Sequence, residues 1–378
     1  MHRCRKRGER PLSLAMTPLR VWLRRLIILA MLGPAAVVAS EFDEAARAYR
    51  DGHHEQALAT FTGLAASGDA RAQYALGRMY EHGDGIAVDA EQARAWYQKS
   101  AAQGYAEAEQ RLALAYEQHG TRKEDKKQAR RWCGLAARHG NAAAVTRLER
   151  YAELGDVAAQ LQLGQMYYRG RGVTRNVDDA FGWFSKAAAR SDVEAIFALG
   201  RMAERGDGRP QSSAAAAAAY QRSAALGHLP STYNLARLYR LGSGIGANAD
   251  LARVLYERAA AGGLLSAQLS LAMLYESGPG WPRDLGRAVE WYRAAAQAGS
   301  ADAQVNLGYL YAAGTGIARD PVEAYALFSA AAAHGHPLAA SNQAQLASSL
   351  SAAQIADADT RARRYADNRS IAAAEPTR

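Results

Sequence analysis

The stretch ARAQYALGRMYEHGDGIAVDAEQARAWYQKSAAQG, from Ala70 to Gly104, decides the fold of this 378-residue chain. It returns six more times, at a spacing of 36 residues that is interrupted once by a spacing of 51. An internal period of about 20 to 50 residues is the signature of a repeat architecture. The sequence therefore predicts one stacked array rather than separate globular domains. The third residue of each copy is small and marks the register: Ala72, Ala108, Ala159, Ala195, Ser231, Ala267 and Ala303.

Each copy predicts two amphipathic helices, because apolar residues recur twice at helical spacing. The first helix carries Ala72, Leu76, Met79 and Tyr80, and the second carries Ala93, Trp96, Tyr97 and Ala101. The glycine pair Gly83 and Gly85 lies between them and favours a left-handed end to the first helix. The pair recurs as Gly170/Gly172, Gly206/Gly208, Gly242/Gly244, Gly278/Gly280 and Gly314/Gly316.

The second helix has a regular start and a regular end. Seventeen positions after the small residue, every copy has a residue whose side chain can accept backbone N–H groups at a helix start. These predicted N-caps are Asp89, Asp125, Asn176, Ser212, Asn248, Asp284 and Asp320. A glycine ends the helix in six copies, and Ser191 takes its place in the third. Each copy is thus predicted to be a helix-turn-helix hairpin.

A single hairpin of this kind cannot bury its apolar face, so neighbouring hairpins must stack. The large aromatic residues of the second helices are predicted to fill the joints as core rather than to form a ligand-binding box. They are Trp96, Tyr97, Trp132, Trp183, Phe184, Tyr220, Tyr256, Trp291, Tyr292 and Phe328.

The pattern A-x-x-x-L-G-x-x-Y…G-x-G…A-x-x-W-Y-x-x-A-A-x-x-G resembles the Sel1-like repeat, a relative of the tetratricopeptide repeat. The resemblance covers roughly residues 69–336. It implies an all-α, right-handed α-solenoid that acts as an adaptor or scaffold rather than a catalyst. The first copy matches at Ala72, Leu76, Gly77, Tyr80, Gly83, Gly85, Ala93, Trp96, Tyr97, Ala101, Ala102 and Gly104. The last matches at Ala303, Leu307, Gly308, Tyr311, Gly314, Gly316, Ala324, Phe328, Ala331, Ala332 and Gly335.

The irregular parts of the chain suggest how the array begins, bends and ends. The segment from Asn141 looks like a first helix with no second helix, which accounts for the 15 extra residues in the long spacing. Terminal repeats are usually atypical. We therefore predict a signal peptide at 1–40, a tetratricopeptide-like capping helix pair at 41–68, repeats 1–2 at 69–140, an extra helix and possible hinge at 141–156, repeats 3–7 at 157–336, capping helices at 337–366 and a flexible tail at 367–378.

The net charge of +9 does not indicate nucleic-acid binding. Residues 1–40 hold eight basic residues and one acid, a net charge of +7, which leaves +2 for the remainder. No basic face with interleaved stacking aromatics follows. We expect no nucleic-acid partner.

Residues 1–40 have the three parts of a secretory signal. Arg24 and Arg25 precede an apolar run, and small residues up to Ala39 suit cleavage near that position. The run is too short to span a bilayer comfortably. We expect a periplasmic or secreted protein, with an uncleaved membrane anchor as the alternative. Met16 is a second candidate for the true start.

No catalytic or metal-binding pattern stands out. The sequence has no Ser-x-x-Lys, His53-His54 lacks a third ligand at helical spacing, and Cys133 is most simply a small core residue. The glutamates that recur at one first-helix position, Glu81, Glu117, Glu204 and Glu276, are interpreted as a solvated stripe. We expect no enzyme activity, no cofactor and no metal.

In the related tetratricopeptide fold the first helices line the concave groove. If the first helices of this chain line a groove in the same way, the groove surface is rich in aromatic residues and arginine, which is the composition of protein-binding hot spots. The candidate residues are Tyr74, Arg78, Glu81, Phe197, Arg201, Tyr233, Arg237, Arg240 and Tyr309. The alternative is that these rings only pack against neighbouring helices.

The predicted function is a non-catalytic scaffold of the cell envelope that binds a protein or peptide partner. The sequence leaves two other functions open. One is a hydrolase of the same fold that acts on cell wall or β-lactams, and the other is a membrane-anchored scaffold of a secretion or polysaccharide-export complex.

Overall fold

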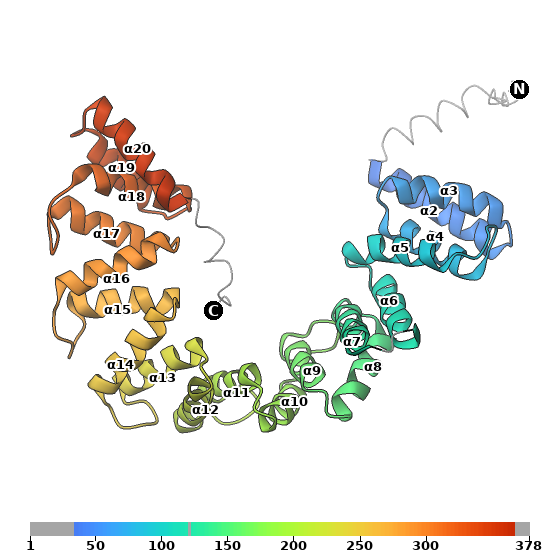
Figure 1. Cartoon of the computed structure of the whole chain (residues 1–378), viewed down its shortest axis with the longest axis horizontal. Helices are drawn as coiled ribbons and strands as arrows, with labels where there is room; N and C mark the ends of the chain where they lie inside the picture. Colours follow the sequence, from blue (N-terminus) through green and yellow to red (C-terminus); the bar gives the residue numbers. More distant parts are fainter. Residues whose placement is uncertain (1–33, 120–121, 367–378) are drawn as a thin grey trace, which may run out of the picture. The chain divides into compact units, whose positions relative to one another are not determined.

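The computed structural model describes residues 34–119 and 122–366, and for residues 34–40, 119 and 366 it describes the backbone alone. These residues form nineteen helices, α2 to α20, and no strand (Figure 1). The chain is an α-solenoid built from repeating helix pairs, as the period predicts. The alternative start at Met16, most of the predicted signal peptide and the predicted tail at 367–378 lie outside the described residues.

The helices group into two compact units. The N-terminal unit comprises residues up to Leu154 together with Arg169–Thr174, and the C-terminal unit comprises Gly155–Tyr168 and the chain from Arg175 onward. The hinge at 141–156 stays a prediction.

The N-terminal unit contains three helix pairs and one single helix. Helix α2 starts ahead of residue 41, so the predicted cleavage site near Ala39 lies within a helix. The single helix α8 occupies the segment that interrupts the 36-residue spacing. The helices are α2 (Pro34–Arg50), α3 (His54–Ala66), α4 (Ala70–His82), α5 (Ala90–Ala102), α6 (Ala106–His119), α7 (Lys123–Arg138) and α8 (Ala142–Glu153).

The C-terminal unit contains five regular pairs and two final helices. The final helix α20 opens with a capping box, in which Ser351 and Gln354 exchange hydrogen bonds of 2.9 and 3.3 Å. The helices are α9 (Val157–Arg169), α10 (Val177–Ala189), α11 (Val193–Arg205), α12 (Ser213–Ala225), α13 (Leu229–Leu241), α14 (Ala249–Ala261), α15 (Leu265–Ser277), α16 (Leu285–Gln297), α17 (Ala301–Ala313), α18 (Pro321–Ala333), α19 (Ala339–Ala347) and α20 (Ala352–Ala366).

Six of the seven predicted N-caps are confirmed, since their side chains accept backbone N–H groups of the second helix. The prediction for Asp125 is wrong. Helix α7 begins three residues earlier than its counterparts, so Asp125 lies within its first turn and accepts from the backbone N–H of Arg122. The second copy lacks the glycine pair that ends the turn elsewhere, and the helix extends into that space.

The left-handed glycine at the end of the first helix is confirmed at Gly83, Gly206, Gly242 and Gly314. At Gly278 the prediction is wrong, because its φ of −68° and ψ of 130° are extended. Pro279 follows directly, and a residue before proline is restricted to extended conformations.

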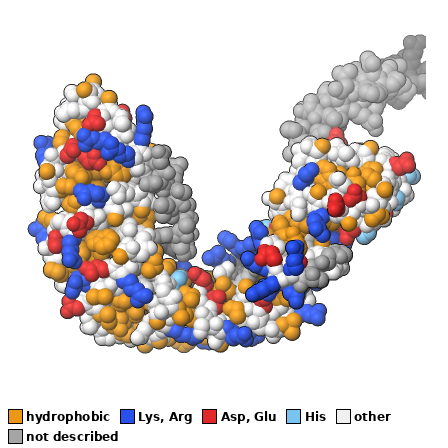
Figure 2. Space-filling view, viewed as in Figure 1, with side chains coloured by type: hydrophobic (Ala, Val, Ile, Leu, Met, Phe, Trp, Pro, Cys, Tyr) orange, Lys and Arg blue, Asp and Glu red, His pale blue; other side chains and the backbone are white. Residues whose placement is uncertain are grey.

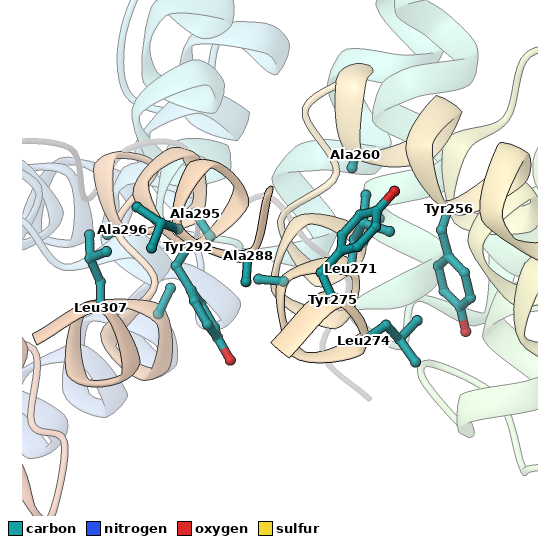
Figure 3. Close-up of a cluster of buried hydrophobic side chains, with 14 of the residues drawn as sticks. Tyr256, Ala260, Leu271, Leu274, Tyr275, Ala288, Tyr292, Ala295, Ala296 and Leu307 are labelled. Carbon is teal, nitrogen blue, oxygen red and sulfur yellow. The ribbon is translucent and has the colours of Figure 1, made fainter. Parts of the chain in front are cut away.

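The stacked helices share a core of tyrosine, phenylalanine, leucine and alanine. The second aromatic position of the second helix is buried in six of the seven repeats, as predicted, and Cys133 takes its place in the second repeat; the six are Tyr97, Phe184, Tyr220, Tyr256, Tyr292 and Phe328. The tryptophans just before it are only half-buried, and Lys99 and Lys186 lie over the rings of Trp96 and Trp183. Figure 3 shows part of the largest cluster, to which neighbouring helices each contribute. No helix in the described ranges combines the length and apolarity needed to cross a membrane.

Candidate functional site

The structure places most of the predicted binding residues in clefts on the first helices. In the N-terminal unit, Tyr74 and Arg78 line a cleft of about 270 Å³. Its other walls come from the capping pair, from α4 itself and from the turn before α6, and they are largely aromatic and basic. These further residues are Phe42, Ala46, Tyr49, Arg50, Phe61, Arg71, Ala75 and Tyr105.

A larger cleft of about 610 Å³ lies in the C-terminal unit, and we name it the arginine cleft. Helices α11 and α13 supply four of the predicted residues, Phe197, Arg201, Tyr233 and Arg237. The remaining lining residues are Glu204, Arg205, Gln211, Tyr220, Pro230, Asn234, Leu264 and Ser266. Arg205 was missed, although it follows Arg201 by four residues and so shares its helix face.

A second cleft of about 290 Å³ adjoins the first, because Tyr233 and Arg237 line both. We name it the methionine cleft. The predicted residue Arg240 lies here, opposite Met273 and Leu274 of α15. The hydroxyl of Tyr233 is 3.1 Å from the hydroxyl of Ser270, which links α13 to α15 at the boundary of the two clefts. On the face of the C-terminal unit that Figure 2 shows, basic and apolar side chains are interspersed.

Among the described residues, Glu204 is the one carboxylate that lines the arginine cleft, and it already has two partners. Glu204 accepts a hydrogen bond of 2.8 Å from the Tyr220 hydroxyl and forms an ion pair with Arg237. Burial and this hydrogen bond raise the pKa of Tyr220, so the phenol stays protonated and donates. Burial alone would lower the pKa of Arg237, but Glu204 raises it.

Three other guanidinium groups of the two clefts have no carboxylate partner among the described residues. Arg201 lies 5.9 Å from the centre of the Phe197 ring, and Arg205 donates to the Tyr168 hydroxyl at 3.4 Å. Arg240 lies beside Tyr256, whose pKa burial raises and Arg240 lowers. The Nε atom of Arg240 is buried without a hydrogen-bond partner.

The predicted rings both pack and line clefts. Phe197 is buried against Tyr220 and His228, at ring distances of 5.9 and 4.8 Å. Tyr233 packs edge-on against Tyr256, and Tyr74 lies 5.3 Å from Tyr105. One side of each ring thus supports the neighbouring helix while another side borders the cleft.

Two predicted residues lie away from these clefts. Glu81 accepts from the Tyr97 hydroxyl and has an ion pair with Arg111 at 3.6 Å. Tyr309 is 45% exposed and accepts a hydrogen bond from Asn342 at 2.7 Å.

The interpretation of the recurring glutamates as a solvated stripe is wrong. Each of them accepts a tyrosine hydroxyl hydrogen bond, and most of these tyrosines lie on the second helix of the same pair. The pairs are Tyr97–Glu81, Tyr151–Glu117, Tyr220–Glu204 and Tyr292–Glu276. Within residues 34–119 and 122–366, no three His, Cys, Asp or Glu side chains come close enough to hold a metal ion.

The repeats identify the family. The Sel1 repeat profile matches seven segments that together make up more than half of the chain, so the chain belongs to the Sel1 repeat family. The matched segments are residues 70–105, 106–141, 157–192, 193–228, 229–264, 265–300 and 301–336. Sel1 repeat proteins are generally non-catalytic scaffolds for protein–protein interactions. No curated protein matches this sequence significantly.

A solved structure supports the same fold. A Sel1 repeat protein from Oxalobacter formigenes is 28% identical, with a TM-score of 0.52, and the match covers 91% of this chain and 98% of that chain. The match to c5321, a protective antigen of uropathogenic Escherichia coli with an SLR fold, is 26% identical with a TM-score of 0.40. It covers 95% of this chain and 90% of that chain.

Proposed function

We propose that this protein is a non-catalytic scaffold of the cell envelope that binds a segment of a partner protein in the arginine and methionine clefts. The observation that carries the proposal is the adjacency of these clefts, which share Tyr233 and Arg237. Together they offer aromatic rings, guanidinium groups that pair with no carboxylate of the described residues, and a partly exposed methionine on consecutive first helices.

This combination suits protein recognition. Aromatic residues and arginine dominate binding hot spots, because they combine a large contact area with directional hydrogen bonds. The first helices are held by the Tyr220–Glu204–Arg237 contacts, so the binding residues are ordered before a partner arrives. A preorganised surface loses less conformational entropy on binding.

The envelope location rests on the sequence of residues 1–40, with its basic region, short apolar run and small residues near Ala39. Export as a cleaved, periplasmic or secreted form is our proposal, and retention through an uncleaved leader is the alternative. N-terminal sequencing of the protein from fractionated cells distinguishes them, because cleavage gives a chain that starts near Ser40.

Affinity capture from an envelope extract tests the binding proposal. The bait is the purified chain, and the cleft variant is Arg201→Ala with Tyr233→Ser. The matched control is Arg258→Ala with Val254→Ser, because both residues are exposed on α14 and line neither cleft. Circular dichroism first confirms that all three proteins are equally helical.

We expect a partner that the wild type and the control retain and that the cleft variant loses. Equal capture by all three proteins would contradict the assignment of binding to these clefts. A partner lost equally from both variants would indicate damage to the fold rather than to a site.

A further inference from the structure

The first helices of the C-terminal unit change character from one repeat to the next. The sixth position after the small register residue is Arg201 on α11, Arg237 on α13, Met273 on α15 and Tyr309 on α17. The first two line the arginine cleft, and Met273 lines the methionine cleft. The surface therefore runs from basic to apolar along the stack.

The part of the surface formed by α11 and α13 has excess positive charge. Among the described residues, four arginines and one glutamate line the two clefts, and the glutamate, Glu204, already contacts Arg237 and Tyr220. Arg201, Arg205 and Arg240 have no carboxylate partner in the described residues. A guanidinium group that is partly removed from water gains from a charge-assisted hydrogen bond, which a carboxylate supplies best.

The apolar end exposes surface that water solvates poorly. Met273 is 52% exposed although it is flanked by the buried Leu274. Pro279 adds to the same cleft. A flexible methionine adapts to ligand side chains of different shapes.

We infer that the partner segment is an extended peptide with acidic residues at one end and apolar residues at the other. The inference rests on the proposed function and names the chemistry of its ligand. The carboxylates face Arg201 and Arg205 in the arginine cleft and Arg240 on the α13 side of the methionine cleft. The apolar side chains lie against Met273 and Leu274 on its α15 side. Because Tyr233 and Arg237 line both clefts, one continuous segment passes over both.

Selection from a random peptide library displayed on phage tests this inference. The purified chain serves as the target, and the library is depleted beforehand on the variant Arg201→Glu with Arg240→Glu. We expect the enriched peptides to combine aspartate or glutamate with a run of leucine, isoleucine, phenylalanine or methionine. Enrichment of basic or uncharged peptides would overturn the inference, as would the absence of any enriched peptide.

Matched variants then show which cleft residues contact the acidic end of the peptide and which contact the apolar end. The enriched peptides serve as synthetic probes, and fluorescence anisotropy measures their binding. Charge reversal at Arg201 and Arg240 should weaken binding at least about tenfold, whereas Arg258→Glu should leave it nearly unchanged. Met273→Ser should weaken binding, and Val254→Ser should not; both native side chains are 52% exposed. Equal losses in test and control variants would contradict the proposed placement.

The inference and the proposed function fail in distinguishable ways. If envelope capture depends on the clefts but the selected peptides are not acidic and apolar, the scaffold function stands and the ligand chemistry is wrong. If capture is independent of the clefts, the proposed function itself fails.

Discussion

The hydroxyl of Tyr220 donates a hydrogen bond of 2.8 Å to the carboxylate of Glu204, sixteen residues earlier in the chain. The same spacing joins Tyr97 to Glu81 and Tyr292 to Glu276, so the contact ties the second helix to the first in three pairs. The fifth repeat places Arg240 beside Tyr256 instead. In two repeats phenylalanine replaces the tyrosine, and the residue sixteen positions earlier is then uncharged instead of glutamate. These pairs are Phe184 with Tyr168 and Phe328 with Ala312.

We predict that Tyr220→Phe lowers the free energy of unfolding by about 1 kcal/mol, because one partly buried hydrogen bond is lost and the ring still packs. Urea unfolding followed by circular dichroism measures the change. The control is Tyr239→Phe, since the Tyr239 hydroxyl makes no hydrogen bond with another described residue. Equal effects of the two substitutions would contradict a specific role for the Glu204 contact.

Close approach between paired helices requires the small residue five positions after the register residue. A Cβ atom added to Gly164 of α9 would lie 2.5 Å from the Phe184 ring of α10. We expect Gly164→Ala to destabilise the protein by about 1–3 kcal/mol through overpacking. Gly182→Ala on α10 has open space around it and should instead stabilise by about 0.5–1 kcal/mol, because alanine has the higher helix propensity. Thermal unfolding of both variants provides the comparison, and stabilisation by both would refute the contact.

Helix boundaries were predictable from the sequence because caps and glycine ends are local signals. Asn248, for example, caps α14 through contacts that extend only three residues along the chain. The prediction failed at Asp125 and Gly278, where the turn itself differs from the other repeats. In both places a local feature, the lost glycine pair or Pro279, overrides the repeat pattern.

The candidate site was only partly predictable. The register placed Phe197, Arg201, Tyr233 and Arg237 on one face, and the structure brings them into one cleft. The pairing of Glu204 with Tyr220 was missed because each glutamate was considered against its counterparts in other repeats, not against its own second helix. Which arginines lack a carboxylate partner depends on side-chain contacts between repeats, and periodicity does not show these.

Cys133 offers a direct probe of packing at the end of the N-terminal unit. Its side chain is fully buried, donates to the backbone carbonyl of Ala144 and has a pKa that burial raises to about 12. The sequence has one other cysteine, Cys4, and its replacement in a Cys4→Ser variant leaves Cys133 as the single thiol. In this variant we expect no reaction with a disulfide reagent at pH 8 until denaturant is added, since the thiolate is the reactive form. Rapid reaction of one thiol in the folded protein would show that α7 and α8 are not packed as described.

The contact between Glu194 and His228 gives a pH-dependent contribution to stability. The Nδ1 atom of His228 accepts from the Ser231 backbone N–H, and its Nε2 atom lies 3.3 Å from Glu194. The hydrogen bond from His228 outweighs burial and lowers the pKa of Glu194 below the ordinary 4.5. A lowered native pKa stabilises the fold above the unfolded value, and this stabilisation is lost as the pH falls through the native pKa.

We therefore expect the stability difference between the wild type and Glu194→Gln to be constant near neutral pH and to shrink as the pH falls below 4.5. Urea unfolding at a series of pH values measures it. A difference that is the same at neutral and strongly acidic pH would contradict the contact.

Photo-crosslinking in living cells tests the central claim most directly. A photoreactive phenylalanine analogue is placed at Tyr233 or Met273, which line the clefts, or at Val254, which is as exposed as Met273 but lies on α14 outside them. The account predicts that positions 233 and 273 crosslink to the same partner protein and that position 254 does not. Crosslinking to that partner from position 254 alone would contradict binding in the clefts.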